Sequence, residues 1–344
     1  MTDRKFGRRP LLFGATSLAA AAVTRRAFAA PLAIRLGWAT MPGHLIPVLF
    51  QNPTQFGLKH YGTSYTVQCT LFRGSSPQLT AVAGGELDLF ASAASTLALG
   101  VTNAHLDLQV VADIIQDGVP GWHSDSFLVH KDSPIKTVSD LKGKRLAINA
   151  IGSAADTIMR VVLKRAGLQD RRDYVVIQAA FPAMPSLLEK HEVDCAIVLQ
   201  PGYRTLMKTG NYRVLFQGRD AFGATETVFL AGRKSWMQDH NAQVQDFMED
   251  WVRSRRWFMA PANRTAAVGI VADFMHLPPE QLDYLFTHDD YYRDPWSFPN
   301  IPGVQKPIDA AVQIGVLKQE IKVSPDHADL SFVEEAKKRI KANA

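Results

Sequence analysis

The sequence has few cysteines and no pattern typical of a bound metal or nucleotide. Its 344 residues include only two cysteines, Cys69 and Cys195, which excludes a scaffold held together by disulfides. Both lie in apolar, strand-like runs, so we expect two free, buried thiols. The strongest histidine cluster, His288-Asp289-Asp290, is more typical of a turn at a helix end than of a metal site. No glycine-rich phosphate loop follows a strand, so we expect no cofactor.

The sequence also lacks a long apolar run, and its N-terminus instead has the pattern of an export signal. Basic residues end in the pair Arg8-Arg9, an Ala- and Leu-rich stretch covers residues 11–23, and small residues suited to a signal peptidase precede position 30. The stretch is shorter than the roughly 20 residues of a membrane span. The paired arginines are typical of a twin-arginine signal. We predict a periplasmic protein cleaved near Ala29; a basic end of a cytosolic protein is the alternative.

Without that segment the chain has almost no net charge. The formal charge of the whole chain is +5. The first 29 residues contain one acid, Asp3, and six basic residues, which together account for the excess: Arg4, Lys5, Arg8, Arg9, Arg25 and Arg26. The sequence pI of 9.1 therefore gives no support for nucleic acid or a membrane surface as a partner.

Short apolar strands alternate with helical patterns in the rest of the chain. This order favours an α/β fold with mostly parallel sheets and helices on both faces. We expect strands over residues 34–38, 66–72, 87–91 and 195–199. Helices are expected to begin at Ser75-Ser76-Pro77, where a serine hydroxyl caps the helix ahead of a first-turn proline, after Ser153 as a capping residue, and at Pro201. Apolar and aromatic residues near helical spacing in the last third are interpreted as core: Phe247, Met248, Trp251 and Trp257.

A loose internal repeat suggests two lobes built on one plan. Residues 79–90 and 187–197 each show a helical pattern, a short turn, and an aspartate (Asp88 or Asp194) before a strand. We interpret both aspartates as strand-entry residues.

Two segments rich in Gly, Pro or Asp, at 113–125 and 218–227, are predicted to cross between the lobes as a two-strand hinge. The expected boundaries are residues 30–116 plus 222–344 for lobe 1, with the C-terminal helices, and 117–221 for lobe 2.

The candidate site follows from the rule that ligands bind beyond the carboxyl ends of the strands, where helix N-termini converge. The loops at 38–44, 73–78, 92–95 and 152–156 meet this description, and most carry Ser or Thr hydroxyls, although these hydroxyls would also serve simply to cap their own helices. Arg73 is the one cation in these loops, which favours a singly charged or zwitterionic organic ligand. The candidate ligand-binding residues are Trp38, Thr40, Met41, His44, Ser75, Ser76, Gln78, Ser92, Ala93, Ser95, Trp122, Gly152, Ser153, Ala154, Asp156, Gln200, Pro201, Tyr203 and Glu226. Asp156 or Glu226, if it enters the cleft, would select an amino or ring-nitrogen group.

Several motifs resemble one family of proteins. The longest of them, residues 131–147 (KDSPIKTVSDLKGKRLA), resembles the periplasmic substrate-binding proteins of ABC importers that bind sulfonates, taurine and nitrate (NMT1/THI5-like). Shorter segments resemble the same family: 74–78, 85–89, 152–155, 192–194, 291–295 and 314–318. The resemblance implies a type II periplasmic-binding-protein fold, a closing cleft, and delivery of the ligand to a membrane permease with its ATPase. It also implies binding roles for Ser75, Ser76, Ser92, Ser95, Ser153 and Ala154. Leu199-Gln200-Pro201 stands where many relatives have Trp and Asp before the proline, which favours sulfonates or carboxylated aromatics over taurine and nitrate.

We therefore predict a monomeric binding protein for a small organic anion, such as an alkyl or aromatic sulfonate or a carboxylate, and not an enzyme. Alternatives are binding of nitrate or of a thiamine-precursor pyrimidine, a binding domain that signals to a membrane sensor, and an enzyme of the same fold that acts on aromatic sulfinates. That enzyme chemistry uses a cysteine in the first pocket loop, where this chain has Thr40, Met41 and His44.

Overall fold

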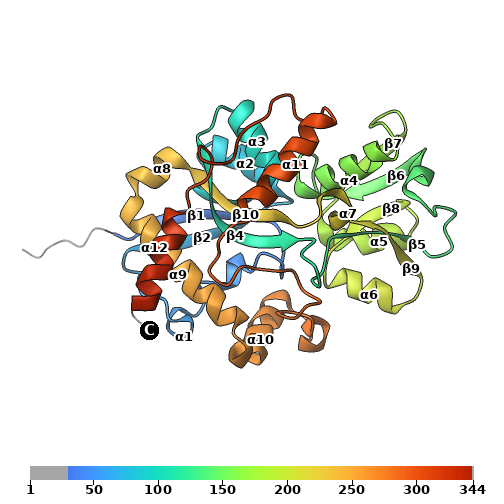
Figure 1. Cartoon of the computed structure of the whole chain (residues 1–344). Coiled ribbons are helices and arrows are strands. Elements are labelled where there is room, and N and C mark those ends of the chain that lie inside the picture. The colour runs from blue at the N-terminus through green and yellow to red at the C-terminus, as the bar shows by residue number, and fades with distance from the viewer. Residues whose placement is uncertain (1–29, 343–344) are drawn as a thin grey trace, which may run out of the picture. The chain divides into compact units, whose positions relative to one another are not determined.

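A computed structural model describes residues 30–342, and the part of the chain that follows Ala30 forms one compact unit. The predicted export signal lies outside the described residues. The strands form two five-stranded sheets (Figure 1). Sheet A contains β1 Leu32–Trp38, β2 Tyr65–Leu71, β3 Leu89–Ser92, β4 Leu108–Asp117 and β10 Thr225–Arg233. Sheet B contains β5 Ser126–His130, β6 Lys144–Ile148, β7 Tyr174–Gln178, β8 Cys195–Val198 and β9 Tyr212–Gln217. We call the residues packed around each sheet the A half and the B half.

The two sheets share one topology. The strand order is β2-β1-β3-β10-β4 in sheet A and β7-β6-β8-β5-β9 in sheet B. One strand in each sheet, β10 or β5, runs antiparallel to both neighbours, and the other paired strands are parallel. The predicted α/β fold with mostly parallel sheets is thereby confirmed.

Helices cover both sheets (Figure 1). In the described part of the chain the α-helices are α1 Pro53–Phe56, α2 Ser75–Ala83, α3 Ala94–Thr102, α4 Ala154–Arg165, α5 Met184–Glu189, α6 Gly202–Lys208, α7 Gly218–Phe222, α8 Lys234–Asp239, α9 Asn241–Met259, α10 Arg264–Met275, α11 Ile301–Gln313 and α12 Ser331–Ala342. Short 3₁₀ turns lie at η1 Ile46–Val48, η2 Val138–Leu141, η3 Phe181–Ala183, η4 Pro261–Asn263 and η5 Pro279–Leu282. None of the described helices is both long and apolar enough to cross a membrane.

The core of the A half shows why α9 forms. Phe247, Met248, Trp251 and Phe258 recur at helical spacing and are fully buried in the apolar cluster on one face of sheet A, while Trp257 packs at its margin. Burial of one such side chain contributes about 1.5–3 kcal/mol. The prediction that these residues form core is confirmed.

The internal repeat corresponds to a repeated ion pair. Asp88 precedes β3 and accepts a hydrogen bond from the backbone N–H of Arg35 in β1 at 2.8 Å, with the Arg35 side chain also paired to it. Asp194 precedes β8 and accepts from the backbone N–H of Arg145 in β6 at 2.8 Å. The strands β1 and β3 occupy the places in sheet A that β6 and β8 occupy in sheet B. Both aspartates therefore tie a strand entry to the neighbouring strand, as predicted.

Two segments connect the halves and lie in contact. One follows β4 and the other, which includes α7, precedes β10. Gly118 has φ of +71°, and a Cβ atom added there would lie 2.2 Å from the carbonyl oxygen of Gly223. Only glycine permits this approach without displacing backbone.

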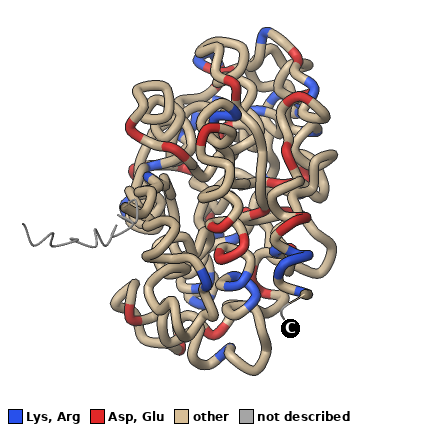
Figure 2. Tube along the Cα trace, turned by 90° about the vertical axis from the view of Figure 1, so that its left-hand side faces the viewer, with Lys and Arg blue, Asp and Glu red and all other residues tan. Residues whose placement is uncertain are grey.

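The thiols are free, as predicted, but only Cys195 is buried. Cys69 is exposed, so the prediction of burial was wrong for it. The cause is the position of β2 at the edge of sheet A, where its last four residues are exposed. Charged residues of both signs are interspersed along the described trace (Figure 2).

Candidate functional site

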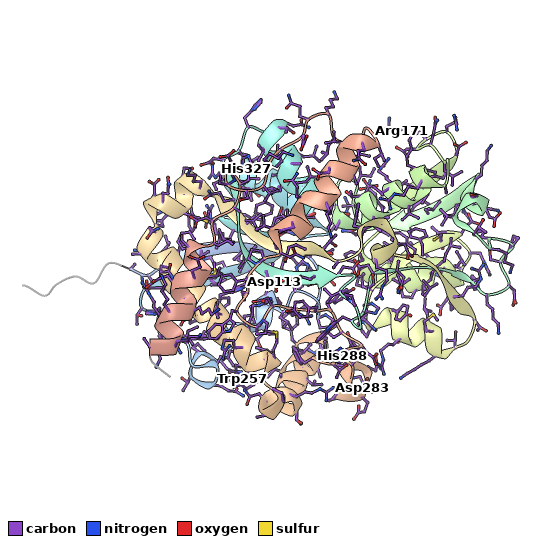
Figure 3. The ribbon with its side chains drawn as sticks, in the orientation of Figure 1. Asp113, Arg171, Trp257, Asp283, His288 and His327 are labelled. Carbon is purple, nitrogen blue, oxygen red and sulfur yellow. The ribbon has the colours of Figure 1, made fainter. Side chains whose placement is uncertain are left out.

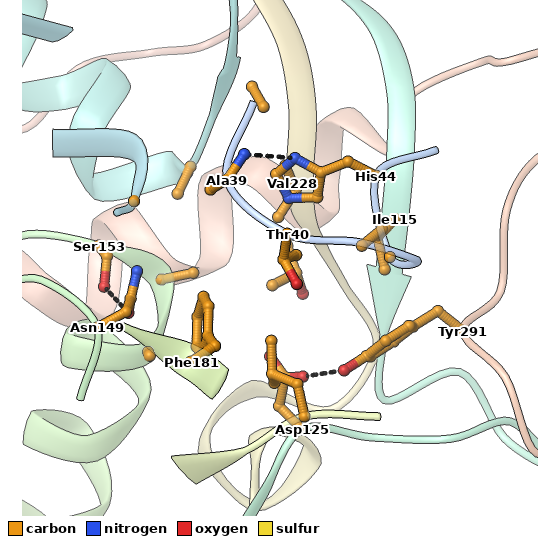
Figure 4. A pocket seen from close by; sticks show the side chains of 18 of the residues that line it. Ala39, Thr40, His44, Ile115, Asp125, Asn149, Ser153, Phe181, Val228 and Tyr291 are labelled. Carbon is orange, nitrogen blue, oxygen red and sulfur yellow. Dashed lines mark hydrogen bonds between the residues drawn. The ribbon is translucent and has the colours of Figure 1, made fainter. Parts of the chain in front are cut away.

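A pocket lies between the two halves, which we call the inner pocket. About 700 Å³ between its walls is free of protein atoms, including space open to solvent. Loops and helix tips from both sheets line it (Figure 4). The lining residues are Ala39, Thr40, Pro42, Gly43, His44, Gly74, Ser75, Ala91, Ala93, Ile115, Asp125, Asn149, Ser153, Ala154, Ala155, Phe181, Leu199, Gln200, Thr227, Val228, Tyr284, Asp290 and Tyr291.

The N-termini of α2 and α3 open into this pocket without side-chain caps. Their N-cap residues are Gly74 and Ala93, which have no side-chain oxygen to accept from the first N–H groups. The prediction that a serine hydroxyl caps α2 was wrong: Ser75 is already the first helical residue, and its Oγ lies 2.8 Å from Oγ1 of Thr96. The uncapped N–H groups and the positive ends of two helix dipoles favour an anion.

The tip of α4 reaches the pocket from the B half and is capped as predicted. Oγ of Ser153 accepts a hydrogen bond from the backbone N–H of Asp156 at 3.4 Å and donates to Oδ1 of Asn149 at 2.9 Å. Nδ2 of Asn149 in turn donates to the carbonyl oxygen of Arg73 at 3.1 Å. This chain of hydrogen bonds joins the two halves beside the pocket.

His44 offers a neutral donor. Burial, with Arg293 nearby, lowers its pKa to about 3, so the ring is uncharged at neutral pH. Its Nδ1 accepts from the backbone N–H of Ala39 at 3.3 Å (Figure 4), which places the proton on Nε2. Among the described residues Nε2 has no hydrogen-bond partner, so it is available to a ligand.

Asp125 is the acid that faces the pocket. Its Oδ1 accepts from the hydroxyl of Tyr291 at 2.5 Å (Figure 4), and burial raises its pKa to about 6. Behind it, Oδ1 of Asp117 accepts from the N–H groups of Gly118 and Asp125 at 2.7 and 3.2 Å. Burial and the proximity of Asp125 raise the pKa of Asp117 to about 8. At neutral pH one proton is therefore retained on this pair of acids.

The charge of the second pocket acid is already balanced. Asp290 accepts from Nη1 of Arg293 at 2.7 Å, and both side chains are buried. Nη2 of the same arginine donates to the carbonyl oxygen of Gly43 at 3.0 Å. No lysine or arginine stands among the lining residues of the inner pocket given above.

A larger, apolar cavity adjoins the inner pocket, which we call the outer groove. It shares Ala39, Thr40, Phe181, Leu199 and Gln200 with the inner pocket and leaves about 1340 Å³ free of protein atoms, solvent included. Its further lining residues are Trp38, Met41, Leu71, Phe72, Arg73, Ala180, Pro182, Pro185, Val198, Pro201, Gly202, Met275 and Leu277. The outer groove therefore extends the inner pocket with a largely apolar wall.

A third, smaller cavity, the rear cavity, contains Glu226. It leaves about 280 Å³ free of protein atoms and is also lined by Ser95 and Ala154. Burial and the neighbouring Asp113 hold the pKa of Glu226 well above its usual value, and its Oε2 accepts from the backbone N–H of Asn300 at 2.7 Å. Glu226 therefore stands behind the inner pocket rather than in it.

The structure brings together a part of the predicted ligand set. Seven of the nineteen line the inner pocket: Thr40, His44, Ser75, Ala93, Ser153, Ala154 and Gln200. Trp38, Met41 and Pro201 line the outer groove, and Ser95 and Glu226 the rear cavity. The others lie outside these three cavities: Ser76, Gln78, Ser92, Trp122, Gly152, Asp156 and Tyr203.

The residues outside the cavities have structural partners. Gln78 bridges the carbonyl of Gly74 and the N–H of Ala91. Asp156 is occupied by the N–H of Gly152 and by Arg160, at 2.8 and 2.7 Å. Trp122 packs on the rings of His288 and Tyr292, while Tyr203 packs on His123.

The predicted ligand set lacks seven pocket residues that Figure 4 labels: Ala39, Ile115, Asp125, Asn149, Phe181, Val228 and Tyr291. Asn149 follows β6 at its carboxyl end, and the strand-end rule would have found it if it had been applied to that strand. Asp125 lies in the predicted crossing segment, where a buried acid was a usable signal. Tyr291 begins the segment 291–295 that shares the family resemblance, but no local pattern indicated its contact with Asp125, which spans 166 residues of sequence.

An ion-pair cluster links α6 of the B half to the segment between α10 and α11. Arg204 of α6 pairs with Asp283 at 2.9 Å and with Asp289 at 3.3 Å. Figure 3 shows Asp283 and His288 on the segment next to α6. Within residues 30–342, no group of three or more His, Cys, Asp or Glu side chains is placed to hold a metal ion.

Two α/β halves of one topology, with strand ends and helix tips around a pocket between them, define a type II periplasmic-binding-protein fold. The sequence model of the NMT1-like family matches residues 30–272, and the chain belongs to that family.

Similar proteins agree with this assignment. A protein of Escherichia coli (strain K12), whose assigned name is that of an aliphatic sulfonates-binding protein, is 29% identical over 172 residues, or 48% of this chain and 51% of that protein. The chain thus matches about half the length of this curated relative.

Solved structures show the same fold. The alkanesulfonate-binding protein SsuA from Xanthomonas axonopodis pv. citri, bound to MOPS, has a TM-score of 0.67 at 21% identity over 88% of this chain and 100% of its own. The nitrate-binding protein NrtA from Synechocystis PCC 6803 has a TM-score of 0.69 at 12% identity, over 91% of this chain and 90% of its own. The desulfurization enzyme DSZB has a TM-score of 0.61 at 13% identity, over 90% of this chain and 99% of its own.

Proposed function

We propose that the protein is an extracytoplasmic solute-binding protein of an ABC importer that captures a small organic anion in the inner pocket. The observation that carries this proposal is the pair of uncapped helix tips at Gly74 and Ala93. Backbone N–H groups at such tips bind carboxylate or sulfonate oxygens without a cationic side chain. Similarity to proteins named for sulfonate and nitrate binding supports the same ligand class.

The outer groove supports an organic ligand over a bare inorganic ion. Trp38, Met41, Phe181 and Leu277 give it apolar walls that a nitrate ion would leave in contact with water. An alkyl or aryl group attached to the anion would bury part of this surface, at about 25 cal/mol per Å². The ligand class is therefore an alkyl or aromatic sulfonate or a carboxylate.

Binding is proposed to close residues 117–221 onto residues 30–116 and 222–344, with the two connecting segments as the hinge. The hydrogen bonds between the halves, such as Asn149 to the carbonyl of Arg73, support a closed form. Export, cleavage near Ala29, monomeric state, and delivery to a permease and its ATPase are parts of the same proposal. Membership of the family and the export pattern of the sequence support them.

Ligand capture without turnover is supported by the positions of the thiols. The enzyme alternative needs an activated cysteine in the pocket. Cys69 is exposed on β2, and Cys195 is buried in β8 with a pKa raised by burial; neither is among the pocket-lining residues given above.

A thermal-shift screen tests the proposed function. The Tm of the mature protein is measured with alkyl and aryl sulfonates, aryl sulfinates, aromatic carboxylates, nitrate, pyrimidines and nucleotides. The same ligands are incubated with unheated protein and analysed by mass spectrometry. We expect organic anions to raise Tm, because a ligand at 100 times its Kd adds about 2.7 kcal/mol to the free energy of unfolding. Nucleotides should give no shift and no ligand should be converted. A shift with nucleotides alone, or conversion of a sulfinate, would contradict the proposal.

A further inference from the structure

We propose that the carboxylate of Asp125 accepts a hydrogen bond from a nitrogen of the ligand. The ligand then carries an ammonium or other N–H group in addition to its anionic group. This inference rests on the proposed function and narrows its ligand class. The nitrogen would be recognised in the inner pocket by the carboxylate of Asp125, and the anion by the tips of α2 and α3.

The first support is the free oxygen of Asp125. The side chain lines the pocket and belongs to a residue that is 8% exposed. Its Oδ1 accepts from the hydroxyl of Tyr291 at 2.5 Å. Within residues 30–342, Oδ2 has no hydrogen-bond donor. A ligand that closes the pocket and excludes water would leave this oxygen unpaired unless the ligand itself donates to it.

The second support is the charge balance of the pocket. Two aspartates and no lysine or arginine stand among the lining residues given for the inner pocket. Asp290 is neutralised by Arg293 at 2.7 Å, whereas Asp125 has no ion-pair partner in the described part of the chain. A ligand with only a negative charge would place that charge near an uncompensated acid. An ammonium group removes this repulsion and adds a charge-assisted hydrogen bond.

The third support is the separation of the two ends of the pocket. Asp125 and Tyr291 lie together on one side of the cavity, and Asn149 and Ser153 lie on another (Figure 4). The helix tips that favour an anion belong to other elements than the connecting segment that holds Asp125. Gly74 and Ala93, at the uncapped tips, line the same pocket as Asp125, so a ligand that spans the pocket would present an anionic oxygen to the tips and a nitrogen to Asp125.

Asp125 also replaces the two acids that the sequence suggested for this role. The carboxylate of Asp156 accepts hydrogen bonds from the N–H of Gly152 and from Arg160. Glu226 lies in the rear cavity, and its Oε2 accepts from the N–H of Asn300. The inner pocket is therefore lined by Asp125 and by neither of the two acids suggested from the sequence.

Matched ligand pairs test the inference by calorimetry. The pairs are 2-aminoethanesulfonate with ethanesulfonate, 3-aminopropanoate with propanoate, and 4-(aminomethyl)benzoate with 4-methylbenzoate. Hydrogen bonds to charged groups are worth about 1.5–3 kcal/mol, so we expect the amino member of at least one pair to bind at least about tenfold more tightly. In Asp125→Asn that preference should fall to about twofold, while the partner without nitrogen keeps or gains affinity.

Tyr291→Phe is the matched control, because it removes the hydroxyl partner and keeps the carboxylate. It should retain the preference for the amino ligand. If the ligands without nitrogen (ethanesulfonate, propanoate and 4-methylbenzoate) bind as tightly as their amino partners, the inference fails and the proposed function stands. If no member of any pair binds, both fail. An unchanged preference in Asp125→Asn also overturns the role of Asp125.

Discussion

Oγ of Ser95, in the A half, donates a hydrogen bond at 3.0 Å to the carbonyl oxygen of Gly152, in the B half. Oγ1 of Thr96 donates to the same oxygen at 3.1 Å. Gly152 has φ of +80°, and a Cβ atom there would lie 3.0 Å from Oγ of Ser76. The glycine thus lets the loop before α4 approach α2 closely. One backbone carbonyl accepts hydrogen bonds from two hydroxyls of the other half, which links the halves beside the pocket.

The variant Ser95→Ala tests this contact. Loss of one such hydrogen bond costs about 1 kcal/mol, so ligand affinity should fall about fivefold if the bond forms only on closure. Thr63→Ala is the matched control, because its hydroxyl bonds to the carbonyl of His60 in an exposed turn. Calorimetry on both variants gives the comparison. Equal affinities in the two variants would show that closure does not depend on this bond.

The variant Gly118→Ala should destabilise the hinge. A methyl group would lie 2.2 Å from the carbonyl oxygen of Gly223 in a left-handed backbone conformation. Strain and overpacking together should lower the free energy of unfolding by about 2–5 kcal/mol. Gly121→Ala shares the positive φ but has open space around the new atom, so it should cost only about 1–2 kcal/mol. Urea unfolding measures both, and equal losses would exclude a role for the contact between the connecting segments.

The variant Glu226→Gln should change how stability depends on pH. Burial and Asp113 raise the pKa of Glu226 well above normal in the folded protein. The folded state therefore holds this proton more tightly than the unfolded state, whose pKa is about 4.3. Stability should fall as pH rises above that value, by up to about 1.4 kcal/mol per pH unit, until the folded pKa is reached.

In Glu226→Gln this fall should be reduced, because the amide carries no titrating proton. The measurement is urea unfolding at pH 5 and pH 8. The exposed Glu192→Gln should keep the wild-type slope. If the wild type and Glu226→Gln lose the same free energy between these pH values, Glu226 does not hold its proton in the folded state.

The variant Phe181→Ala tests the outer groove. Phe181 lines both the groove and the inner pocket. An aromatic contact contributes about 0.5–1.5 kcal/mol beyond buried area, so affinity for an aryl sulfonate should fall about threefold or more, with little change for methanesulfonate. Val175→Ala, on the exposed outer strand of sheet B, is the control. A similar loss for both ligands would place the aryl group elsewhere.

The sequence predicted those parts of the fold that depend on local patterns. Strand and helix order follows from apolar periodicity, and the repeat of Asp88 and Asp194 marks one topology used twice. The burial of Cys69 was mispredicted, because an apolar strand gives no sign of whether it lies at the edge of its sheet.

The candidate site was predictable where a strand end meets a helix start, as at Ser75, Ala93 and Ser153. It was not predictable where the pocket wall comes from distant segments. Asp125 and Tyr291 meet only because the connecting segment passes the loop that precedes α11, a contact that spans 166 residues of sequence. The direction in which a side chain points could not be predicted from the sequence either. Asp156 follows the cap of α4 as expected, yet its carboxylate binds Arg160 and the N–H of Gly152.

The central claim, that the pocket between the halves holds the ligand, is tested most directly by titration calorimetry on the wild type and on Thr40→Trp. Thr40 lines both the inner pocket and the outer groove, and an indole there would fill the space between them (Figure 4). The ligand with the largest thermal shift should bind the wild type one to one. Thr40→Trp should keep the wild-type Tm without ligand and lose at least about a hundredfold in affinity, which corresponds to about 2.7 kcal/mol. Wild-type affinity in a folded Thr40→Trp protein would contradict the claim.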